Sequence, residues 1–431
     1  MTVSPAETSP REDDAPAPTP AFRNPGSGFL VALGFASILL MASLLSVGIL
    51  TMPLQATAID PDRSTSIVST VSLFAGIAAL IASPIMGRLS DRTTSRLGRR
   101  RPYLVAGAVL LVAGAFLVLE ASATGMLAAG WVVMSLGQIA AFTALGACIP
   151  DQFAAERRGP ASALFGIGGV AGAVVGLWLG SLFSPNLTLM IMVPAGLGAA
   201  ALLAFAAVLR DDRISPEDRP ELQLRSAFGT FWVNPVRHPA FALAFGSRFA
   251  VFCAIAAVNA YMAIFLILGL HIDPMEIADK MFVANLLSGG IAFVIANIAG
   301  RLSDRIGRRK PFVWTSAVVF TVGLGLIVAA DTFNAFLVAL VVMGIGQGIY
   351  LAVDFALITQ VLPDPEDSAK DLGIMNLAAS LPNILVPAVA PALLAIGASA
   401  AAPQNFTVFF TAAAIAGAIG ALLIIPIRGV R

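Results

Sequence analysis

The sequence has 431 residues, of which 58% are hydrophobic and 12% are charged, with a formal net charge of +1 and a mean hydropathy of +0.88. A soluble domain is usually about one quarter charged, so this composition excludes a chain folded around one water-facing core and indicates lipid as the solvent. The two cysteines, Cys148 and Cys253, lie within apolar runs and predict neither a disulfide framework nor a metal site.

Residues 1–27 are rich in Pro, Ala and acidic side chains and predict a disordered cytoplasmic tail. Twelve apolar segments follow, each about as long as a helix that crosses ~30 Å of hydrocarbon. Because these runs are continuously apolar and lack the alternation of a membrane barrel, they predict helices. The expected spans, numbered helix 1 to helix 12 in chain order, are 28–54, 66–86, 103–120, 126–150, 160–183, 188–209, 240–270, 278–299, 312–330, 333–361, 372–398 and 405–427.

The distribution of Lys and Arg predicts the orientation. If the N-terminus is cytoplasmic, 23 of the 26 basic residues fall in the tails and cytoplasmic loops. The positive-inside rule then places both termini in the cytoplasm. We expect the chain to lie in the plasma (inner) membrane. The polar segment 210–239 is expected to be a cytoplasmic linker between two six-helix bundles, 28–209 and 240–431.

A charged motif occurs twice. Gly87–Tyr103 has the sequence GRLSDRTTSRLGRRRPY, and Gly300–Phe312 has the sequence GRLSDRIGRRKPF. Gly137-Gln138 is likewise matched by Gly346-Gln347. Repeated halves of six helices are typical of secondary transporters, which bind a solute near the midplane and rock one half against the other. The sequence therefore predicts an all-α membrane protein with twelve transmembrane helices in two pseudo-symmetric bundles.

The duplicated GxxSDRxGRRxP pattern resembles the loop signature of the major facilitator superfamily, and the resemblance covers about residues 28–428. The longer first copy, SDRTTSRLGRRRP, is similar to the branch with the sucrose–proton and glycoside–pentoside–hexuronide cation symporters. This resemblance implies proton- or cation-coupled symport of a sugar-like solute by alternating access. It further implies a chain in the bilayer that works as a monomer, with no cofactor and no nucleic-acid partner.

Two departures from that branch leave other functions open. The nearest match to its acid on helix 4 is Asp151, at the cytoplasmic end, and helix 5 has no embedded arginine. A proton-coupled exporter of apolar or drug-like compounds is the alternative, and a membrane sensor without transport is a third. No catalytic constellation is visible, so an enzyme is not expected.

The resemblance also implies a cytoplasmic latch between the halves. Asp91 would face the start of helix 11 near Gly373, Asp304 would face the start of helix 5 near Gly159, and Arg92 would reach Asp151. The alternative is that these charges only set the topology, which is the main role expected of Arg99, Arg100 and Arg101. The expected latch residues are Gly87, Asp91, Arg92, Asp151, Gly300, Asp304 and Arg305.

Small residues mark one face of helix 5. Gly168, Gly172, Gly176 and Gly180 recur every four residues and share that face, where they allow a close helix approach. We interpret the face as a sliding contact between the halves, against Ser288–Gly290 of helix 8, with static packing inside one half as the alternative. Helix 11 contains three prolines and is expected to be kinked or broken.

Two ionisable residues lie at membrane depth. Arg248 in helix 7 and Asp354 in helix 10 are expected at similar depths, so they could pair. One hypothesis is that Asp354 binds a coupling proton and Arg248 senses its charge. The alternative is a permanent salt bridge between the two helices.

The expected solute site consists of polar or amphipathic residues at membrane depth on helices 1, 4, 7, 10 and 11. Amides with one or two aromatic rings would suit a neutral polyol, although any of the asparagines could be a structural amide. Gln138 and Gln347 are favoured, because each occupies a duplicated position. The expected residues are Gln138, Asn259, Tyr261, Gln347, Tyr350, Asn376 and Asn383, with Ser43 and Thr51 on helix 1.

Overall fold

The computed structural model describes residues 25–211, 213, 238–307, 310–360, 368–398 and 404–426. Within these ranges all regular secondary structure is helical, and twelve helices are long and apolar enough to cross a membrane. The predicted fold class and the twelve expected spans are confirmed. The expected tail at 1–27 and the expected linker at 210–239 lie almost entirely outside the described residues, so the proposed domain boundaries stay a prediction.

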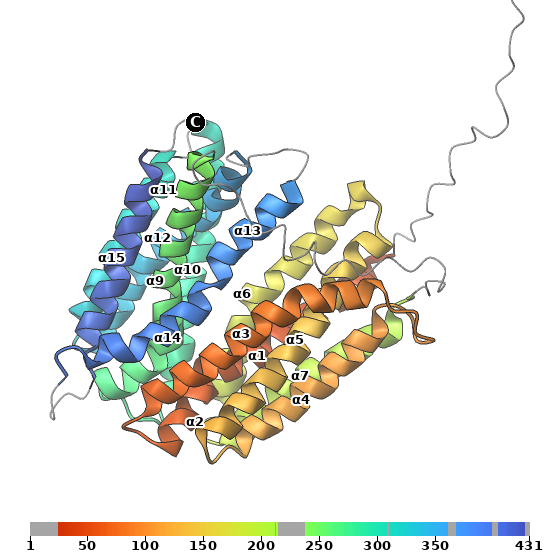
Figure 1. Ribbon diagram of the computed structural model, residues 1–431, viewed down its shortest axis with the longest axis horizontal. Helices are drawn as coiled ribbons and strands as arrows, with labels where there is room; N and C mark the ends of the chain where they lie inside the picture. Colours follow the sequence, from red (N-terminus) through yellow and green to blue (C-terminus); the bar gives the residue numbers. More distant parts are fainter. Residues whose placement is uncertain are drawn as a thin grey trace, which may run out of the picture.

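The first six spans form the N-terminal half (Figure 1). The first span is continuous through three helical segments, and the other five are single helices. Their bounds are α1 Ser27–Leu45, η2 Ser46–Thr51 and α2 Met52–Ile59, then α3 Ser64–Asp91, α4 Arg101–Leu119, α5 Thr124–Gln152, α6 Arg158–Leu182 and α7 Leu187–Val208, with the short turn η3 Ala155–Arg157 before α6.

The last six spans form the C-terminal half, drawn in green to blue in Figure 1. The seventh span consists of α9 and η5, and the eleventh consists of α13 and α14. The bounds are α9 Pro239–Ile264, η5 Phe265–Gly269, α10 Ile277–Ile306, α11 Lys310–Val328, α12 Phe333–Gln360, α13 Ser368–Ser380, α14 Pro382–Ala395 and α15 Phe406–Ile424.

The packing inside the two halves repeats. In the N-terminal half α4 and α3 pack on α5, and in the C-terminal half α11 and α10 pack on α12 in the same way. Similarly, α1 and α4 pack on α7, while α9 and α11 pack on α15. These main packing contacts recur six spans later, which is the internal symmetry that the duplicated motif predicts.

The two halves meet at one end of the molecule and separate at the other (Figure 1). We call the end with the Arg-rich segment 92–100 the basic side, and the opposite end the far side. Across the halves α3 packs on α14 and α6 packs on α10. Ser181 donates a hydrogen bond to Asp279, and Ser184 Oγ donates to the Met275 carbonyl at 3.4 Å, both near the far side. The structure is therefore open towards the basic side.

The eleventh span is broken, as its prolines predict. The helix α13 ends at Ser380, and α14 begins at Pro382 after the turn at Leu381. Proline cannot donate the backbone hydrogen bond that would continue α13, and its ring clashes with the preceding turn. The segment α13 packs on α9, whereas α14 also packs on α3 of the other half.

Two π-helical segments were not anticipated from the sequence. Ser46–Thr51 continues α1, and Phe265–Gly269 continues α9, so they occupy the first helix of each half. A π segment adds one residue to a turn and is often found at functional sites. Both segments lie in the far-side part of their spans.

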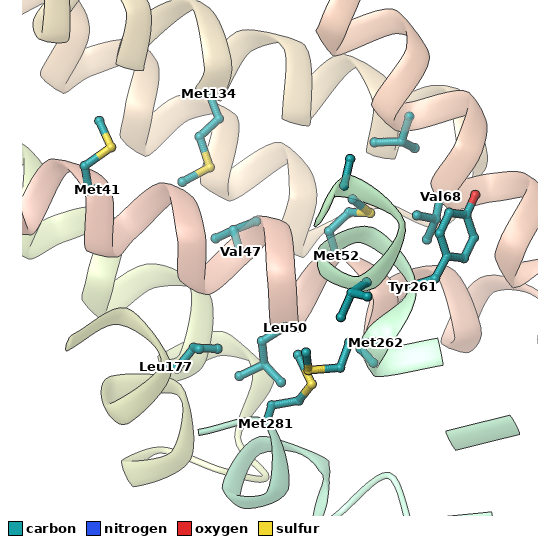
Figure 2. Packing of buried hydrophobic residues seen from close by; sticks show 14 of the residues in the cluster. Met41, Val47, Leu50, Met52, Val68, Met134, Leu177, Tyr261, Met262 and Met281 are labelled. Carbon is teal, nitrogen blue, oxygen red and sulfur yellow. The ribbon is translucent and has the colours of Figure 1, made fainter. Parts of the chain in front are cut away.

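The buried apolar core is continuous between the halves at the far side. Leu50 and Met52 of the N-terminal half belong to the same buried cluster as Met262 and Met281 of the C-terminal half (Figure 2). Flexible methionine side chains fill irregular gaps between helices with little strain. Apolar packing between these four residues therefore helps to close the far side.

Candidate functional site

A cavity of about 350 Å³ lies between the two halves. The N-terminal half contributes α1 with its continuation η2 and α2, together with α3 and α5, and the C-terminal half contributes α9 and α14. Most of the lining is apolar, and its polar members are hydroxyls, carboxamides and one indole. These polar members are Ser72, Trp131, Ser135, Gln138, Asn259 and Asn383.

Carboxamides at the cavity have unused hydrogen-bonding capacity. Among the described residues, neither Gln138 nor Asn259 makes a side-chain hydrogen bond. Asn383 donates from Nδ2 to the Ala379 carbonyl at 3.2 Å, which leaves its amide oxygen as an acceptor. A carboxamide offers two donor hydrogens and an acceptor oxygen. The cavity therefore presents donors and acceptors from both halves.

The described lining contains no Asp, Glu, Lys, Arg or His. A charged solute bound there would lose water without gaining a counter-charge, and an unpaired charge is costly in an apolar site. A neutral solute loses less and can replace its water with the carboxamides. The electrostatics of the cavity thus favour an uncharged solute.

The structure brings only some of the expected solute-site residues to this cavity. Gln138, Asn259 and Asn383 line it. The expectation for Tyr261 is wrong in this conformation, because its side chain is fully buried and its hydroxyl pairs with Ser69 at 2.7 Å. The remaining expected residues lie outside the described lining; they are Gln347, Tyr350, Asn376, Ser43 and Thr51.

Trp131 is the cavity residue that the sequence reasoning missed. It lies one turn from Ser135 and two turns from Gln138 on α5, so the three side chains share one helix face. The sequence contained a signal for Trp131. The duplicated Gly-Gln pair already indicated this helix, and Trp131 has the spacing that places it on the same face as Gln138.

The predicted Arg248–Asp354 ion pair is present and joins α9 to α12. Both side chains are largely buried, the Arg248 guanidinium carbon lies 5.1 Å from the centre of the Phe252 ring, and Tyr350 contacts Asp354. Arg248 Nε is buried without a hydrogen-bond partner in the described part of the chain. The pair lies outside the cavity lining, in the C-terminal half, so a coupling role would have to act through α9 or α12.

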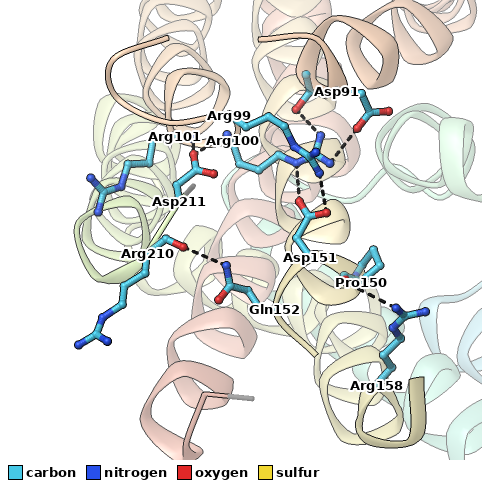
Figure 3. A network of polar contacts seen from close by, with 11 residues as sticks. Asp91, Arg99, Arg100, Arg101, Pro150, Asp151, Gln152, Arg158, Arg210 and Asp211 are labelled. Atoms are coloured by element: carbon cyan, nitrogen blue, oxygen red, sulfur yellow. Dashed lines mark hydrogen bonds and ion pairs between the residues drawn. The ribbon is translucent and has the colours of Figure 1, made fainter. Parts of the chain in front are cut away.

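The first copy of the charged motif forms an ion-pair network within its own half (Figure 3). Arg100 pairs with Asp91 at 2.8 Å and with Asp151 at 2.9 Å, and Arg99 pairs with Asp151 at 2.6 Å. Burial alone lowers the pKa of the Arg100 guanidinium, but Asp151 and then Asp91 outweigh it, so this pKa is raised. The network ties the ends of α3, α4 and α5 together.

One expectation for this motif needs correction, and two others stay predictions. Arg92 does not reach Asp151, and its Nε and Nη1 atoms are buried without a partner among the described residues. Arg99 and Arg100 bind Asp151, and their expected role in setting the topology stays a prediction. Asp91 pairs with Arg100 of its own half in this conformation, and its expected latch to the start of helix 11 stays a prediction.

The residue Asp211 fixes the beginning of α4. Its carboxylate accepts hydrogen bonds from the backbone N–H groups of Arg100 at 2.5 Å and Arg101 at 2.8 Å. A carboxylate at a helix N-terminus satisfies free N–H groups and interacts favourably with the helix dipole. The Arg101 side chain in turn donates to the Leu209 carbonyl from Nε at 3.0 Å. The end of α7 is therefore held against the start of α4.

The second motif copy is less fully described. Gly300 lies on α10 near Ala352 of α12, and Arg305 is exposed. The side chain of Asp304 lies outside the described residues, so its expected contact with the start of helix 5, which is α6 in the structure, stays a prediction. Gly87 has the equivalent position on α3, near Thr143 of α5.

The glycine face of helix 5, which is α6 in the structure, packs inside the N-terminal half. The expected sliding contact of this face with helix 8, which is α10, is wrong in this conformation. The four glycines lie against α1 and η2, where the nearest groups belong to Ser37, Met41, Ala42 and Leu50. A side chain at Gly176 would overlap the Ala42 backbone. Absence of side chains thus lets α6 and α1 approach closely. The alternative of packing within one half describes the structure.

The family model for the Major Facilitator Superfamily matches residues 27–299 and 247–430. The chain belongs to the Major Facilitator Superfamily.

Solved structures share this fold. The nucleoside transporter NupG has a TM-score of 0.72 at 14% identity and covers 94% of this chain and 100% of its own. A bacterial homolog of the human lysosomal transporter Spinster, inward-facing and unoccupied, has a TM-score of 0.65 at 14% identity, covering 93% and 94%.

Sequence relatives in this superfamily match only part of the chain. A stretch of 126 residues is 32% identical to the multidrug resistance protein MdtL of Klebsiella pneumoniae (strain 342) and covers 29% of each protein. The match thus spans less than a third of that relative's length. Superfamily membership establishes a multi-pass membrane transporter rather than an enzyme. The expected sucrose and glycoside branch is not confirmed.

Proposed function

We propose that this superfamily member is an alternating-access exporter of uncharged, amphipathic solutes. The observation that carries the proposal is the cavity between the halves, which has unpaired carboxamides and no ionisable side chain in its described lining. Apolar surface with a few well-placed polar groups is typical of sites for drug-sized molecules.

Export is supported by the name of a sequence relative, and the conformation is compatible with it. The partial relative in Klebsiella pneumoniae is named a multidrug resistance protein. With the basic side in the cytoplasm, as the positive-inside rule predicts, the two halves separate towards the cytoplasm. In this state an exporter takes up its solute and an importer releases it, so the conformation is compatible with both directions.

Coupling to protons is assigned to Asp354 and Arg248 under this proposal. Protonation of Asp354 would release Arg248, which has a buried Nε without a partner in the described structure. The freed guanidinium would then form a hydrogen bond with another acceptor. Protonation would therefore change the relative stability of two arrangements in which α9 packs differently against α12. Proton binding and solute binding would be linked through α9, which also holds Asn259.

A second candidate is proton-coupled import of a sugar-like solute. The carboxamides of Gln138, Asn259 and Asn383 favour it, because amides pair well with hydroxyl groups. The predominantly apolar remainder of the lining favours the amphipathic solute instead.

Reconstitution into proteoliposomes tests both candidates. Three probes are compared: 4-methylumbelliferyl β-D-glucoside as an uncharged amphipath, methyl β-D-glucoside as a sugar, and tetraphenylphosphonium as a cation. We expect counterflow of the uncharged amphipath and, with an imposed pH gradient, its accumulation against a concentration gradient. Transport of methyl glucoside alone would favour the sugar importer. Transport of tetraphenylphosphonium alone would contradict a site for uncharged solutes.

A further inference from the structure

Trp131 of α5 rests on the backbone of Gly48 in the π segment η2. A side-chain carbon added to Gly48 would lie 2.7 Å from Cη2 and 2.9 Å from Cζ2 of the indole, which is closer than atoms can pack. The benzo edge of Trp131 therefore occupies the place of a missing side chain. Both residues line the cavity between the halves.

The rest of the indole is available to the cavity. Trp131 is only partly buried, and its Nε1 makes no hydrogen bond within the described residues. Contact with Gly48 holds one edge of the ring and restricts its rotation. A rigid aromatic surface loses little conformational entropy when it binds another ring.

The hydrogen-bonding groups around this ring come from different helices. Ser135 and Gln138 follow Trp131 on the same face of α5, while Asn259 and Asn383 lie on α9 and α14 of the other half. A ring against Trp131 could thus have its polar substituents bound by the opposite half. Such a solute would contact both halves at once.

We infer that Trp131, held by Gly48, is the ring-binding and specificity-determining residue of the cavity, and that the solute carries a flat unsaturated ring together with uncharged hydroxyl or amide groups. This inference rests on the proposed function and narrows its solute class. Offset stacking or edge-to-face contact with the indole discriminates a flat ring from a puckered one of similar size.

Phenyl β-D-glucoside and cyclohexyl β-D-glucoside form a matched pair of probes, because they differ only in ring unsaturation. Binding to the purified full-length protein is measured by isothermal titration calorimetry. We expect the wild type to bind the phenyl compound roughly tenfold more tightly than the cyclohexyl compound. Trp131→Leu should remove this preference, and Trp131→Phe should keep part of it.

A second variant tests the support under the ring. Gly48→Ala places a methyl group where the indole edge lies, so Trp131 must move, and the phenyl preference should fall. Trp178→Leu is the control, because Trp178 is 48% exposed on α6 and does not line the cavity. Melting temperature and gel-filtration profile establish that each variant is folded.

The results separate failure of the inference from failure of the proposed function. Equal phenyl preference in the wild type and in folded Trp131→Leu overturns the inference, as does equal binding of the two probes to the wild type. In either case transport of the uncharged amphipath by the wild type can persist, and the proposed function stands. If the wild type binds neither glucoside at millimolar concentration and transports only the cation, both fail.

Discussion

Ser69 of α3 and Tyr261 of α9 join the two halves through a buried hydrogen bond, with their hydroxyl oxygens 2.7 Å apart. The Tyr261 ring is held from its own half by an edge-to-face contact with Phe409, at 4.8 Å between ring centres. Because this pair lies where the halves meet, opening the far side requires that the bond break. It is therefore part of the barrier that closes the far side.

Tyr261→Phe removes this bond and keeps the ring contact with Phe409. A buried hydrogen bond contributes about 1 kcal/mol net, so we expect roughly a fivefold shift towards the state that is open on the far side. Spin labels on exposed Leu189 and Met275, in a cysteine-free background, report the far-side separation by electron paramagnetic resonance. A larger population of long distances is the expected result.

A double-mutant cycle supplies the control for this prediction. Ser69→Ala should shift the distances in the same direction, and the double variant should shift them by less than the sum of the two single changes. Fully additive shifts would contradict a direct bond between the two hydroxyls in the working protein.

Gly176→Leu should destabilise the N-terminal half. The new side chain would overlap the Ala42 backbone and separate α6 from α1, at a cost of about 1–3 kcal/mol. Gly169→Leu is the matched control on the same helix, because nothing lies within 4 Å of a side-chain carbon there. Thermal unfolding in detergent should show a lower melting temperature for the first variant only. Equal melting temperatures would count against close packing of α1 on α6.

Arg100→Ala should destabilise the basic side of the N-terminal half. The Arg100 side chain is 4% exposed and pairs with both Asp91 and Asp151, so its loss is expected to cost about 3 kcal/mol. Arg96→Ala is the control, because Arg96 is an exposed arginine of the same loop. Chemical denaturation measures the difference. Similar stability of the two variants would show that the network is not structurally important.

Asp354→Asn tests the coupling role. Asparagine keeps the shape of the side chain but cannot be deprotonated, so accumulation driven by a pH gradient should be lost while counterflow of the same solute continues. Glu120→Gln, at an exposed acid after α4, is the control. Undiminished accumulation by folded Asp354→Asn would show that the Arg248–Asp354 pair is a permanent structural bridge.

The fold was predictable because its signals are local. A membrane span is set by about twenty consecutive apolar residues and by charges at its ends, and both are visible in one sequence. The break at Leu381 was predictable for the same reason, because proline acts on its own turn. The π segments carry no comparable signal, since SVGILT and FLILG are ordinary apolar helix sequences.

The site was less predictable because it depends on helix rotation. Asn259 and Tyr261 are two residues apart and so point about 200° apart around α9, which means that they cannot both face the cavity. The sequence alone did not indicate which of them does. Similarly, the choice between Arg92 and Arg99 as partner of Asp151 depends on the loop after α3, where Gly98 has a φ of +107°. This backbone conformation favours glycine.

The break at Leu381 lets the two parts of the eleventh span, α13 and α14, pack against different helices. The segment α14 contacts α3 where the halves meet, and it holds Asn383 at the cavity, whereas α13 packs on α9 beside the open side. The chain therefore has one piece of this span at the cavity and at the contact between the halves, and another piece beside the open side. Reporter groups on α13 and on α14 should consequently move at different stages of one transport cycle.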